Sequence, residues 1–291
     1  DFIESNKHLP AQGSVEWLNS RSTTIGGSEI ATLLGLNPYQ NLKKLISQKA
    51  GITTFTKSAP LWFGNIMEAV LQNYTEQIFN TKIYETGSIQ YDKSMYLKYS
   101  PDGLAVVKKK HLEKIFTEDD IKFKINNKSK FDNINDDELI ILFEFKNPFM
   151  RMPKQGIVPI YYKPQPEMGM HVIDICEASI FIEGVFRFCS YNDVIDLNNK
   201  YNTRYHFDKI RYTNQPIAYG AFTLFYSKDD LSDKMIDIIN LITSHIHSFN
   251  VHDYDLSAIG NYKIINAIME NIIDHKNIKI KYHNLYLNDI N

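Results

Sequence analysis

The feature that most constrains this chain is an apolar run, ELIILFEFK at residues 138–146, that carries two charges near its end. Its β-branched and aromatic residues predict a largely buried strand. Side chains two positions apart in a strand point to the same face, so Glu144 and Lys146 are expected to lie side by side. A buried charge has to be paired or bound to a metal ion. The fold must therefore supply partners to these two residues.

Helical and β-rich segments around this run predict an α/β fold. Apolar residues at helical spacing predict a long helix over about 58–80. Its expected buried stripe consists of Phe63, Ile66, Met67, Val70, Leu71, Tyr74 and Ile78. Other helices are expected at about 17–21, 28–35, 40–50, 164–175, 230–249 and beyond 251, with Ser28 as the N-cap of the second. Strands are expected at about 82–91, 95–100, 103–109, 177–186, 205–213 and 218–227.

The chain shows no internal repeat and no Pro/Ser-rich linker, so one domain over residues 1–291 is expected. Its core should cover about 17–190. The polar, Asn/Asp/Lys-rich stretch at about 111–138 is expected to be an insertion, and about 191–291 a C-terminal extension.

Composition excludes several classes of protein. A hydrophobic content of 43% exceeds that of disordered chains, and two cysteines are too few for a disulfide scaffold. The sequence has no apolar stretch long enough to span a membrane and no recognisable signal peptide, so a soluble intracellular protein is expected. The formal net charge is −2, so any contact with nucleic acid must rest on local basic patches or on a bound cation.

Two carboxylates and a lysine suggest the chemistry of the site. Asp102 stands at the start of the strand expected at 103–109, and Glu144 and Lys146 lie on the apolar strand. Hard carboxylate oxygens suit Mg²⁺, which polarises a phosphate and activates water. The lysine can orient that water or neutralise developing charge. These residue types therefore point to metal-dependent hydrolysis of a phosphodiester.

Several ordered motifs resemble one known family. Pro101-Asp102 with Glu144-Phe145-Lys146 is similar to the PD-(D/E)XK nuclease signature. The wider match is to the λ-exonuclease-like or YqaJ-type viral recombinase nucleases, and it runs from about 17 to 185. Its further motifs are Trp17, Arg21, Gly26-Gly27-Ser28-Glu29, Gly64 with Glu68, Ser100-Pro101-Asp102-Gly103 and Tyr162 with Gln165. Two features depart from the family pattern: Glu167 replaces the second glutamine, and the interval from Asp102 to Glu144 is longer.

The resemblance implies a restriction-endonuclease-like core, with a central mixed sheet flanked by helices, and a role for each matched residue. Asp102 and Glu144 would ligate Mg²⁺, or Mn²⁺ as a substitute, together with the main-chain carbonyl of Phe145. Lys146 would position the attacking water, and Glu68 would be an accessory metal ligand or would hold a water molecule. A second group would form a pocket for the 5′-phosphate of a DNA end: Arg21, Ser28, Ser100 and Gln165.

The function that the resemblance implies is a Mg²⁺-dependent exonuclease that digests one strand of linear double-stranded DNA 5′→3′ in recombination or repair. Its partners would be duplex DNA with a 5′-phosphate end and a single-strand annealing protein, and relatives in the family can form homo-oligomeric rings. A viral protein of this kind would act in the host cytoplasm or a viral factory.

Alternatives stay open at this point. The chain could be an endonuclease or single-strand nuclease on the same fold, or a DNA-binding scaffold with an inactive core. Single residues also have ordinary structural explanations. Asp102 suits a β-turn, Glu68 is a common helix former, and Arg21 could form a surface ion pair.

Overall fold

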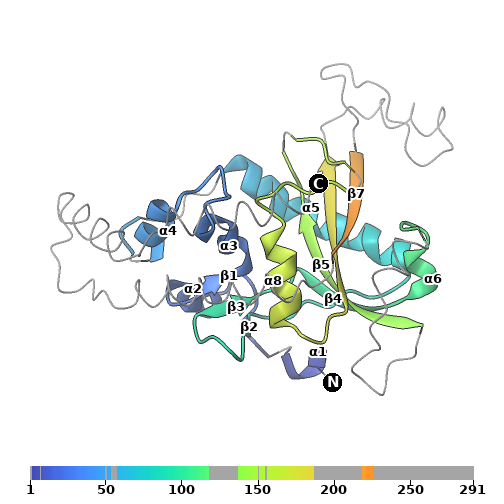
Figure 1. Cartoon of the computed structure of the whole chain (residues 1–291), viewed down its shortest axis with the longest axis horizontal. Helices are drawn as coiled ribbons and strands as arrows, with labels where there is room; N and C mark the ends of the chain where they lie inside the picture. The colour runs from blue at the N-terminus through green and yellow to red at the C-terminus, as the bar shows by residue number, and fades with distance from the viewer. Residues whose placement is uncertain are drawn as a thin grey trace.

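The structure is a computed structural model of the whole chain (Figure 1). It describes residues 2–6, 8–49, 51–53, 58–117, 137–149, 151–154, 156–186 and 218–225. The predicted strand at 205–213, the predicted helices at 230–249 and beyond 251, and residues 118–136 of the predicted insertion lie outside this part of the chain.

The fold is mixed α/β, as predicted. The helices are α1 (Phe2–Asn6), α2 (Val15–Ser22), α3 (Gly27–Leu33), α4 (Leu42–Lys49), α5 (Ala59–Phe79), α6 (Lys109–Leu112) and α8 (Pro164–Val172). The strands are β1 (Ile25–Gly26), β2 (Ile89–Gln90), β3 (Leu97–Tyr99), β4 (Gly103–Lys108), β5 (Glu138–Lys146), β6 (Ala178–Phe186) and β7 (Ala218–Phe225).

Two sheets carry the fold. The larger sheet has the order β4-β5-β6-β7, in which β5 runs antiparallel to β4 and parallel to β6, and β7 runs antiparallel to β6. The smaller sheet has the order β1-β3-β2, with β1 and β3 parallel. The central strand is β5, the apolar run at 138–146, and its neighbours on both sides explain why so many of its residues are buried.

Helices cover both faces of the large sheet (Figure 1). On one face α3, α4 and α8 form a core with Leu142 of β5. On the other face α5 and α6 form a second core with Ile141 and Phe143. Residues 140, 142, 144 and 146 of β5 therefore face the α8 side, since side chains alternate along a strand. The predicted common face of Glu144 and Lys146 is confirmed.

Helix α5 begins and ends close to the predicted bounds. Ser58 is its N-cap, Pro60 lies in its first turn, and Asn80 ends it in the left-handed conformation with φ +47°. The predicted buried stripe is partly wrong. Phe63 and Leu71 are buried, but Ile66 and Val70 are 45% and 50% exposed.

The helix is rotated relative to the prediction because another row of residues meets the sheet. Leu71, Thr75 and Phe79, spaced four apart, are buried, and the Phe79 ring lies 5.9 Å from that of Phe143. The start of the predicted insertion also differs from expectation. Leu112 of α6 and Phe116, which lie within the stretch predicted as an insertion, are buried in the α5-side core.

The ring of Tyr99, at the end of β3, is unusually closely packed. Tyr99 of β3 is 1% exposed, and its ring lies between α3 and α8. A Cβ added to Gly27 would be 2.3 Å from Tyr99 Cε2, and one added to Gly169 would be 2.5 Å from Tyr99 Cζ. Only glycine at both positions lets the two helices approach this ring from either side.

In the part of the chain that is described, no helix is long and apolar enough to cross a membrane.

The close packing predicts a large stability difference between two glycine substitutions. Gly169→Ala should lower the free energy of unfolding by about 1–3 kcal/mol, because the new methyl group overlaps the fixed Tyr99 ring. Gly64→Ala is the matched control: it is also helical, a Cβ there meets nothing within 4 Å, and it should raise stability by up to about 1 kcal/mol. Urea denaturation measures both; equal effects would contradict the packing described.

Candidate active site

The carboxylates of Asp102 and Glu144 are brought together by strand pairing. In the antiparallel β4–β5 ladder, Gly103 pairs with Phe143. Continuing that register by one residue places Asp102 opposite Glu144, on the face covered by α8. Asp102 accepts a hydrogen bond from the main-chain N–H of Phe145, at 2.8 Å from Oδ2. The strand register therefore fixes the relative position of the two predicted metal ligands.

Glu144 is completely buried and is contacted from three elements. Tyr99 of β3 donates its hydroxyl to Oε2 at 2.8 Å. Lys146 Nζ and Gln165 Nε2, from β5 and α8, both donate to Oε1. A buried carboxylate is costly unless its oxygens are paired or hydrogen-bonded, and each oxygen here has a partner.

Lys146 is the point on which the oxygens of the site converge. Its ammonium nitrogen donates to Glu144 Oε1, lies 3.0 Å from the carbonyl oxygen of Phe145 and 3.6 Å from Oδ2 of Asp102. These are three of the four residues predicted to supply metal ligands, and the fourth is Glu68. Burial alone would lower the pKa of Lys146, but the charges of Glu144 and Asp102 hold it above the usual value. Lys146 thus stays a cation at neutral pH.

Burial and neighbouring charges also shift the pKa values of two acidic residues, Glu144 and Glu68. Burial, followed by the negative charge of Asp102, raises the pKa of Glu144 to about 8, although Lys146 and Tyr99 oppose the shift. Burial and Asp102 also raise the pKa of Glu68 to about 7. Glu68 on α5 is therefore close enough to interact with Asp102, as the sequence predicts for an accessory ligand. Asn147, which donates to the carbonyl of Gly64 at 3.1 Å, ties the end of β5 to α5.

The donor set fits a hard divalent cation. Two carboxylates and a main-chain carbonyl direct oxygen atoms at one cationic nitrogen, and Mg²⁺ prefers such oxygen ligands together with water. Among the described residues, no group of three Asp, Glu, His or Cys side chains is gathered closely enough to hold a metal. A cation here would therefore depend on Asp102, Glu144, the carbonyl of Phe145 and water.

The residues of the predicted phosphate pocket come from α2, α3 and the segment before β4. Arg21 Nη2 lies 3.5 Å from Ser28 Oγ. Trp17 links this pair to Ser100, since its indole N–H donates to Ser100 Oγ at 3.0 Å and the Arg21 guanidinium lies 4.7 Å from its ring centroid. Arg21, Ser28 and Ser100 are thus neighbours through Trp17. Gln165 differs, because its amide is directed at Glu144.

The predicted cap of α3 is wrong. The N-cap is Gly26, and Ser28 is the second residue of the helix. Gly26 takes this position because its extended backbone places its N–H 2.9 Å from Oε2 of Glu29, the third helical residue, as in one half of a capping box. The Ser28 hydroxyl is therefore not used as a cap and stays exposed beside Arg21.

Glu29 also fixes Arg21. Its two oxygens lie 2.9 Å from Arg21 Nη2 and 2.8 Å from Lys49 Nζ. Burial raises the pKa of Glu29, but the charges of Arg21 and Lys49 outweigh this and hold the pKa below the usual value. The ion pair that sequence analysis considered for Arg21 therefore exists. It leaves the Arg21 side chain 30% exposed, with its guanidinium next to Ser28.

Two contacting residues were not predicted as part of the site. Tyr99 donates to Glu144, and Trp17 joins Arg21 to Ser100. Both stand in the quoted motifs or directly beside them: Trp17 begins the first motif, and Tyr99 precedes Ser100. A buried tyrosine next to an acidic turn was the available signal, because its hydroxyl needs a partner.

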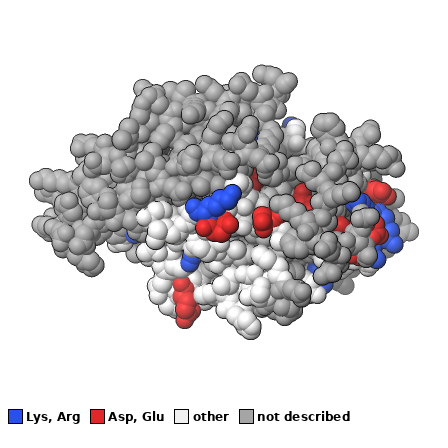
Figure 2. Space-filling model, turned by 60° about the horizontal axis from the view of Figure 1, so that its bottom comes forward, with Lys and Arg blue, Asp and Glu red and all other residues white. Residues whose placement is uncertain are grey.

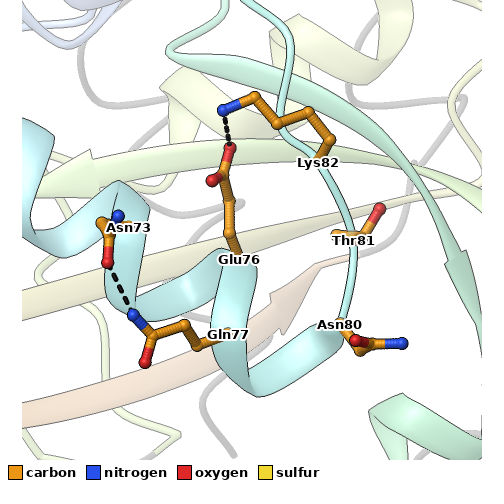
Figure 3. Close-up of a pocket in the computed structure, with 6 residues that line it drawn as sticks. All are labelled: Asn73, Glu76, Gln77, Asn80, Thr81 and Lys82. Atoms are coloured by element: carbon orange, nitrogen blue, oxygen red, sulfur yellow. Dashed lines mark hydrogen bonds and ion pairs between the residues drawn. The ribbon is translucent and has the colours of Figure 1, made fainter.

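The hollow at the C-terminal end of α5 is separate from the candidate active site. It has a volume of about 430 Å³ and is lined by Asn73, Glu76, Gln77, Asn80, Thr81 and Lys82 (Figure 3). Its charged residues, Glu76 and Lys82, pair with each other at 2.8 Å. None of the predicted site residues lines it. The arrangement offers no reactive group, so the candidate site stays at the ends of β4 and β5.

Charge on the surface is mixed. Figure 2 shows acidic and basic side chains of the described residues lying next to one another in small groups on the face in view. This agrees with the formal net charge of −2. Among the described residues on this face, any contact with an anionic ligand would rest on local basic side chains.

Comparison with known proteins identifies relatives. The profile of the YqaJ-like viral recombinase domain matches residues 16–175, a range that contains every predicted site residue. Protein D345L of African swine fever virus (strain Badajoz 1971 Vero-adapted) is 30% identical over 231 residues, covering 77% of this chain and 63% of D345L. The protein of isolate Tick/South Africa/Pretoriuskop Pr4/1996 is 28% identical over 233 residues. The chain thus spans less than two thirds of these relatives.

A solved structure has a similar fold. The alkaline exonuclease LHK-Exo from Laribacter hongkongensis superposes with a TM-score of 0.50 at 13% sequence identity, covering 81% of this chain and 93% of LHK-Exo. The same enzyme in complex with dAMP gives a TM-score of 0.50 at 12% identity. At this identity the likeness shows a shared fold.

The raised pKa of Glu144 predicts a pH-dependent stability. Its pKa is about 8 in the folded protein against 4.5 for an unperturbed glutamate carboxyl, so between these values the folded state binds more protons than the unfolded state. Stability is then lost as the pH rises through 8, by up to about 1.4 kcal/mol per pH unit. Without divalent ions, the melting temperature should fall between pH 7 and 8.5. Glu68, with a pKa of about 7, contributes mainly below this window.

Glu144→Gln is the control for that experiment, because the amide keeps the shape and cannot titrate. Its melting temperature should be nearly constant from pH 7 to 8.5. Differential scanning calorimetry in the presence of EDTA measures both proteins. Equal slopes in the two proteins would show that another group titrates.

Proposed function

The chain belongs to the YqaJ-like viral recombinase family, and on this basis we propose that it is a Mg²⁺-dependent deoxyribonuclease with a PD-(D/E)XK core. It acts at ends of linear double-stranded DNA, 5′→3′, in recombination or repair. One observation carries the proposal: oxygens of Asp102, Glu144 and Phe145 converge on the Lys146 ammonium group. This convergence brings together oxygen ligands for a divalent cation and the lysine that hydrolysis requires.

The proposed division of labour follows from the contacts. Asp102, Glu144 and the Phe145 carbonyl would hold the metal ion, which when bound would polarise the phosphate as a Lewis acid and activate a water molecule. Glu68 on α5, whose charge interacts with that of Asp102, is the accessory group, either as a ligand or by holding a water molecule. Lys146 stays protonated, because Glu144 and Asp102 raise its pKa, and its ammonium group orients the water and neutralises developing charge. Tyr99 keeps Glu144 in place through its hydroxyl group.

The proposed end recognition rests on a second cluster. Arg21 presents a partly exposed guanidinium beside the Ser28 hydroxyl, and Trp17 joins them to Ser100. A guanidinium fork suits the terminal phosphate of a DNA strand. Gln165 contacts Glu144, and its Cγ would lie 3.5 Å from a Cβ added to Gly27, the residue before Ser28, so it is near both groups. A pocket of this kind favours an exonuclease that starts at 5′-phosphorylated ends.

Further parts of the proposal concern the whole protein. Because this chain spans 63% of its D345L relative, its substrates and partners are proposed rather than inherited. We expect Mn²⁺ to replace Mg²⁺, a single-strand annealing protein to act on the product strand, and assembly into a homo-oligomer. Residues 1–291 form one nuclease domain acting inside the infected cell.

Lys146→Ala tests the core of the proposal. It should reduce the rate of Mg²⁺-dependent degradation of linear duplex DNA by at least about 100-fold, since it removes the group that orients water. Lys110→Ala, at an exposed lysine of α6, is the matched control and should keep full activity. Gel assays with Mg²⁺ or EDTA measure degradation, and circular dichroism confirms folding.

Three results in this assay would change the assignment. Full activity of Lys146→Ala would remove Lys146 from the mechanism. Cutting of closed circular DNA by the wild-type protein would establish an endonuclease instead. A folded wild-type protein that binds DNA and cleaves none of these substrates would be a scaffold with an inactive core.

Arg21→Ala tests the phosphate pocket. The ratio of initial rates on 5′-phosphate and 5′-hydroxyl ends should fall about 10- to 100-fold, because a hydrogen bond to a charged group is lost. Arg21→Lys, which keeps the charge but not the fork, should give an intermediate ratio. Lys49 still neutralises Glu29 in both variants, so the fold is retained. An unchanged ratio in Arg21→Ala would place end recognition elsewhere.

A further inference from the structure

Three tyrosines form a continuous aromatic ladder beside the candidate active site. Tyr39 lies in the loop after α3, and Tyr161 and Tyr162 lie in the turn before α8. The Tyr39 and Tyr161 rings meet edge to face, with centroids 5.7 Å apart and planes at 88°. The Tyr161 and Tyr162 centroids are 4.5 Å apart, and Tyr162 in turn lies 5.6 Å from Phe181 of β6.

The ladder runs from solvent to the core. Tyr39 is 76% exposed, whereas Phe181 is fully buried. The loop that carries Tyr39 is held by its own hydrogen bonds. Asn37 donates to Thr32 Oγ1 at 2.9 Å and accepts from the Tyr39 main-chain N–H at 2.9 Å. An edge-on contact covers at most one face of a ring, so the outer rung is an accessible aromatic surface in a fixed position.

The inner rings of the aromatic ladder, Tyr162 and Phe181, lie beside the candidate active site. Phe181 pairs in register with Glu144 in the β5–β6 ladder. Tyr162 is close enough to Lys146 to interact electrostatically with it. The turn that carries both tyrosines leads directly into α8, because the main-chain N–H of Gln165 donates to the carbonyl of Tyr162 at 3.1 Å. The aromatic ladder of Tyr39, Tyr161 and Tyr162 therefore extends outward from the neighbourhood of Glu144.

The buried carboxylate of Glu183 holds the positively charged side chain of Arg151 near the aromatic ladder. Glu183 of β6 is 1% exposed, pairs in register with Lys146, and forms an ion pair with Arg151. The charge of Arg151 in turn acts on Tyr161. Arg151 is 30% exposed, so a cation held by a buried partner lies within electrostatic reach of Tyr161. Aromatic rings and an adjacent cation are the two elements by which proteins hold single nucleotides without sequence preference.

We propose that Tyr39, supported by Tyr161 and Tyr162, is a stacking platform for a nucleobase of the DNA strand bound at the active site, with Arg151 facing a neighbouring phosphate. This inference rests on the proposed nuclease function and adds a base-binding subsite to it. Stacking is sequence-tolerant because every base has a π-face, which suits an enzyme that must process any sequence. The ladder is anchored already, so little side-chain entropy is lost when a base binds.

The test measures binding without hydrolysis. The wild-type protein in EDTA is titrated into 5′-phosphorylated duplexes that carry 2-aminopurine at successive positions from the end. At the stacked position the protein should quench the fluorescence, and Tyr39→Ala should abolish that quenching and weaken binding about 5- to 100-fold. Tyr39→Phe, which keeps the ring, should bind within about twofold of the wild-type protein. Met95→Ala is the control, because Met95 is 74% exposed in the turn between β2 and β3.

An abasic nucleotide completes a double-mutant cycle. Placed at the quenched position, it should weaken binding by the wild-type protein to the level of Tyr39→Ala and leave Tyr39→Ala unaffected. Equal binding and quenching by the wild-type protein and Tyr39→Ala would overturn the platform. So would equal losses in Met95→Ala and Tyr39→Ala. If the wild-type protein neither binds nor degrades DNA, the proposed function fails; if only the Tyr39 effects are absent, the platform alone fails.

Discussion

The buried carboxylate of Glu144 is the interaction on which the rest of the site depends. It lies near the end of β5, an inner strand of the large sheet, with no exposed surface, and an unpaired charge there would cost several kcal/mol. Its partners come from three separate elements, with Tyr99 on β3, Lys146 on β5 itself and Gln165 on α8. Folding the small sheet, the large sheet and α8 into register is therefore the condition for stabilising this one group.

The ring of Tyr99 connects the two halves of the site. Its hydroxyl contacts Glu144, while α3 at Gly27 and α8 at Gly169 pack against its ring. Gly27 directly precedes Ser28 in the proposed phosphate pocket, and Gly169 lies one turn after Gln165. One side chain thus sets the spacing between the proposed phosphate pocket and the proposed metal ligands. A displacement of either helix would be felt at both places, since close-packed interiors transmit strain.

Much of the fold could be predicted because it follows from local pattern. Apolar runs and turn residues predicted β4, β5, β6 and α5 close to their observed bounds. The rotation of α5 could not be predicted, since its sequence has apolar residues on more than one side and the sheet selects the row containing Leu71 and Phe79. The prediction of the N-cap of α3 was wrong for a similar reason. Gly26 and Ser28 both suit such a position, and the reach of Glu29 back to the Gly26 N–H decided between them.

The sequence by itself determined which residue types are available and which share a strand face. Alternation in β5 is a property of the extended backbone, so Glu144 and Lys146 had to lie together whatever surrounded them. Only the tertiary structure decided what meets them. The pairing of β4 with β5 put Asp102 opposite Glu144, and helix packing brought in Tyr99 and Gln165. Such contacts join residues far apart in the chain, and their geometry depends on how whole elements pack.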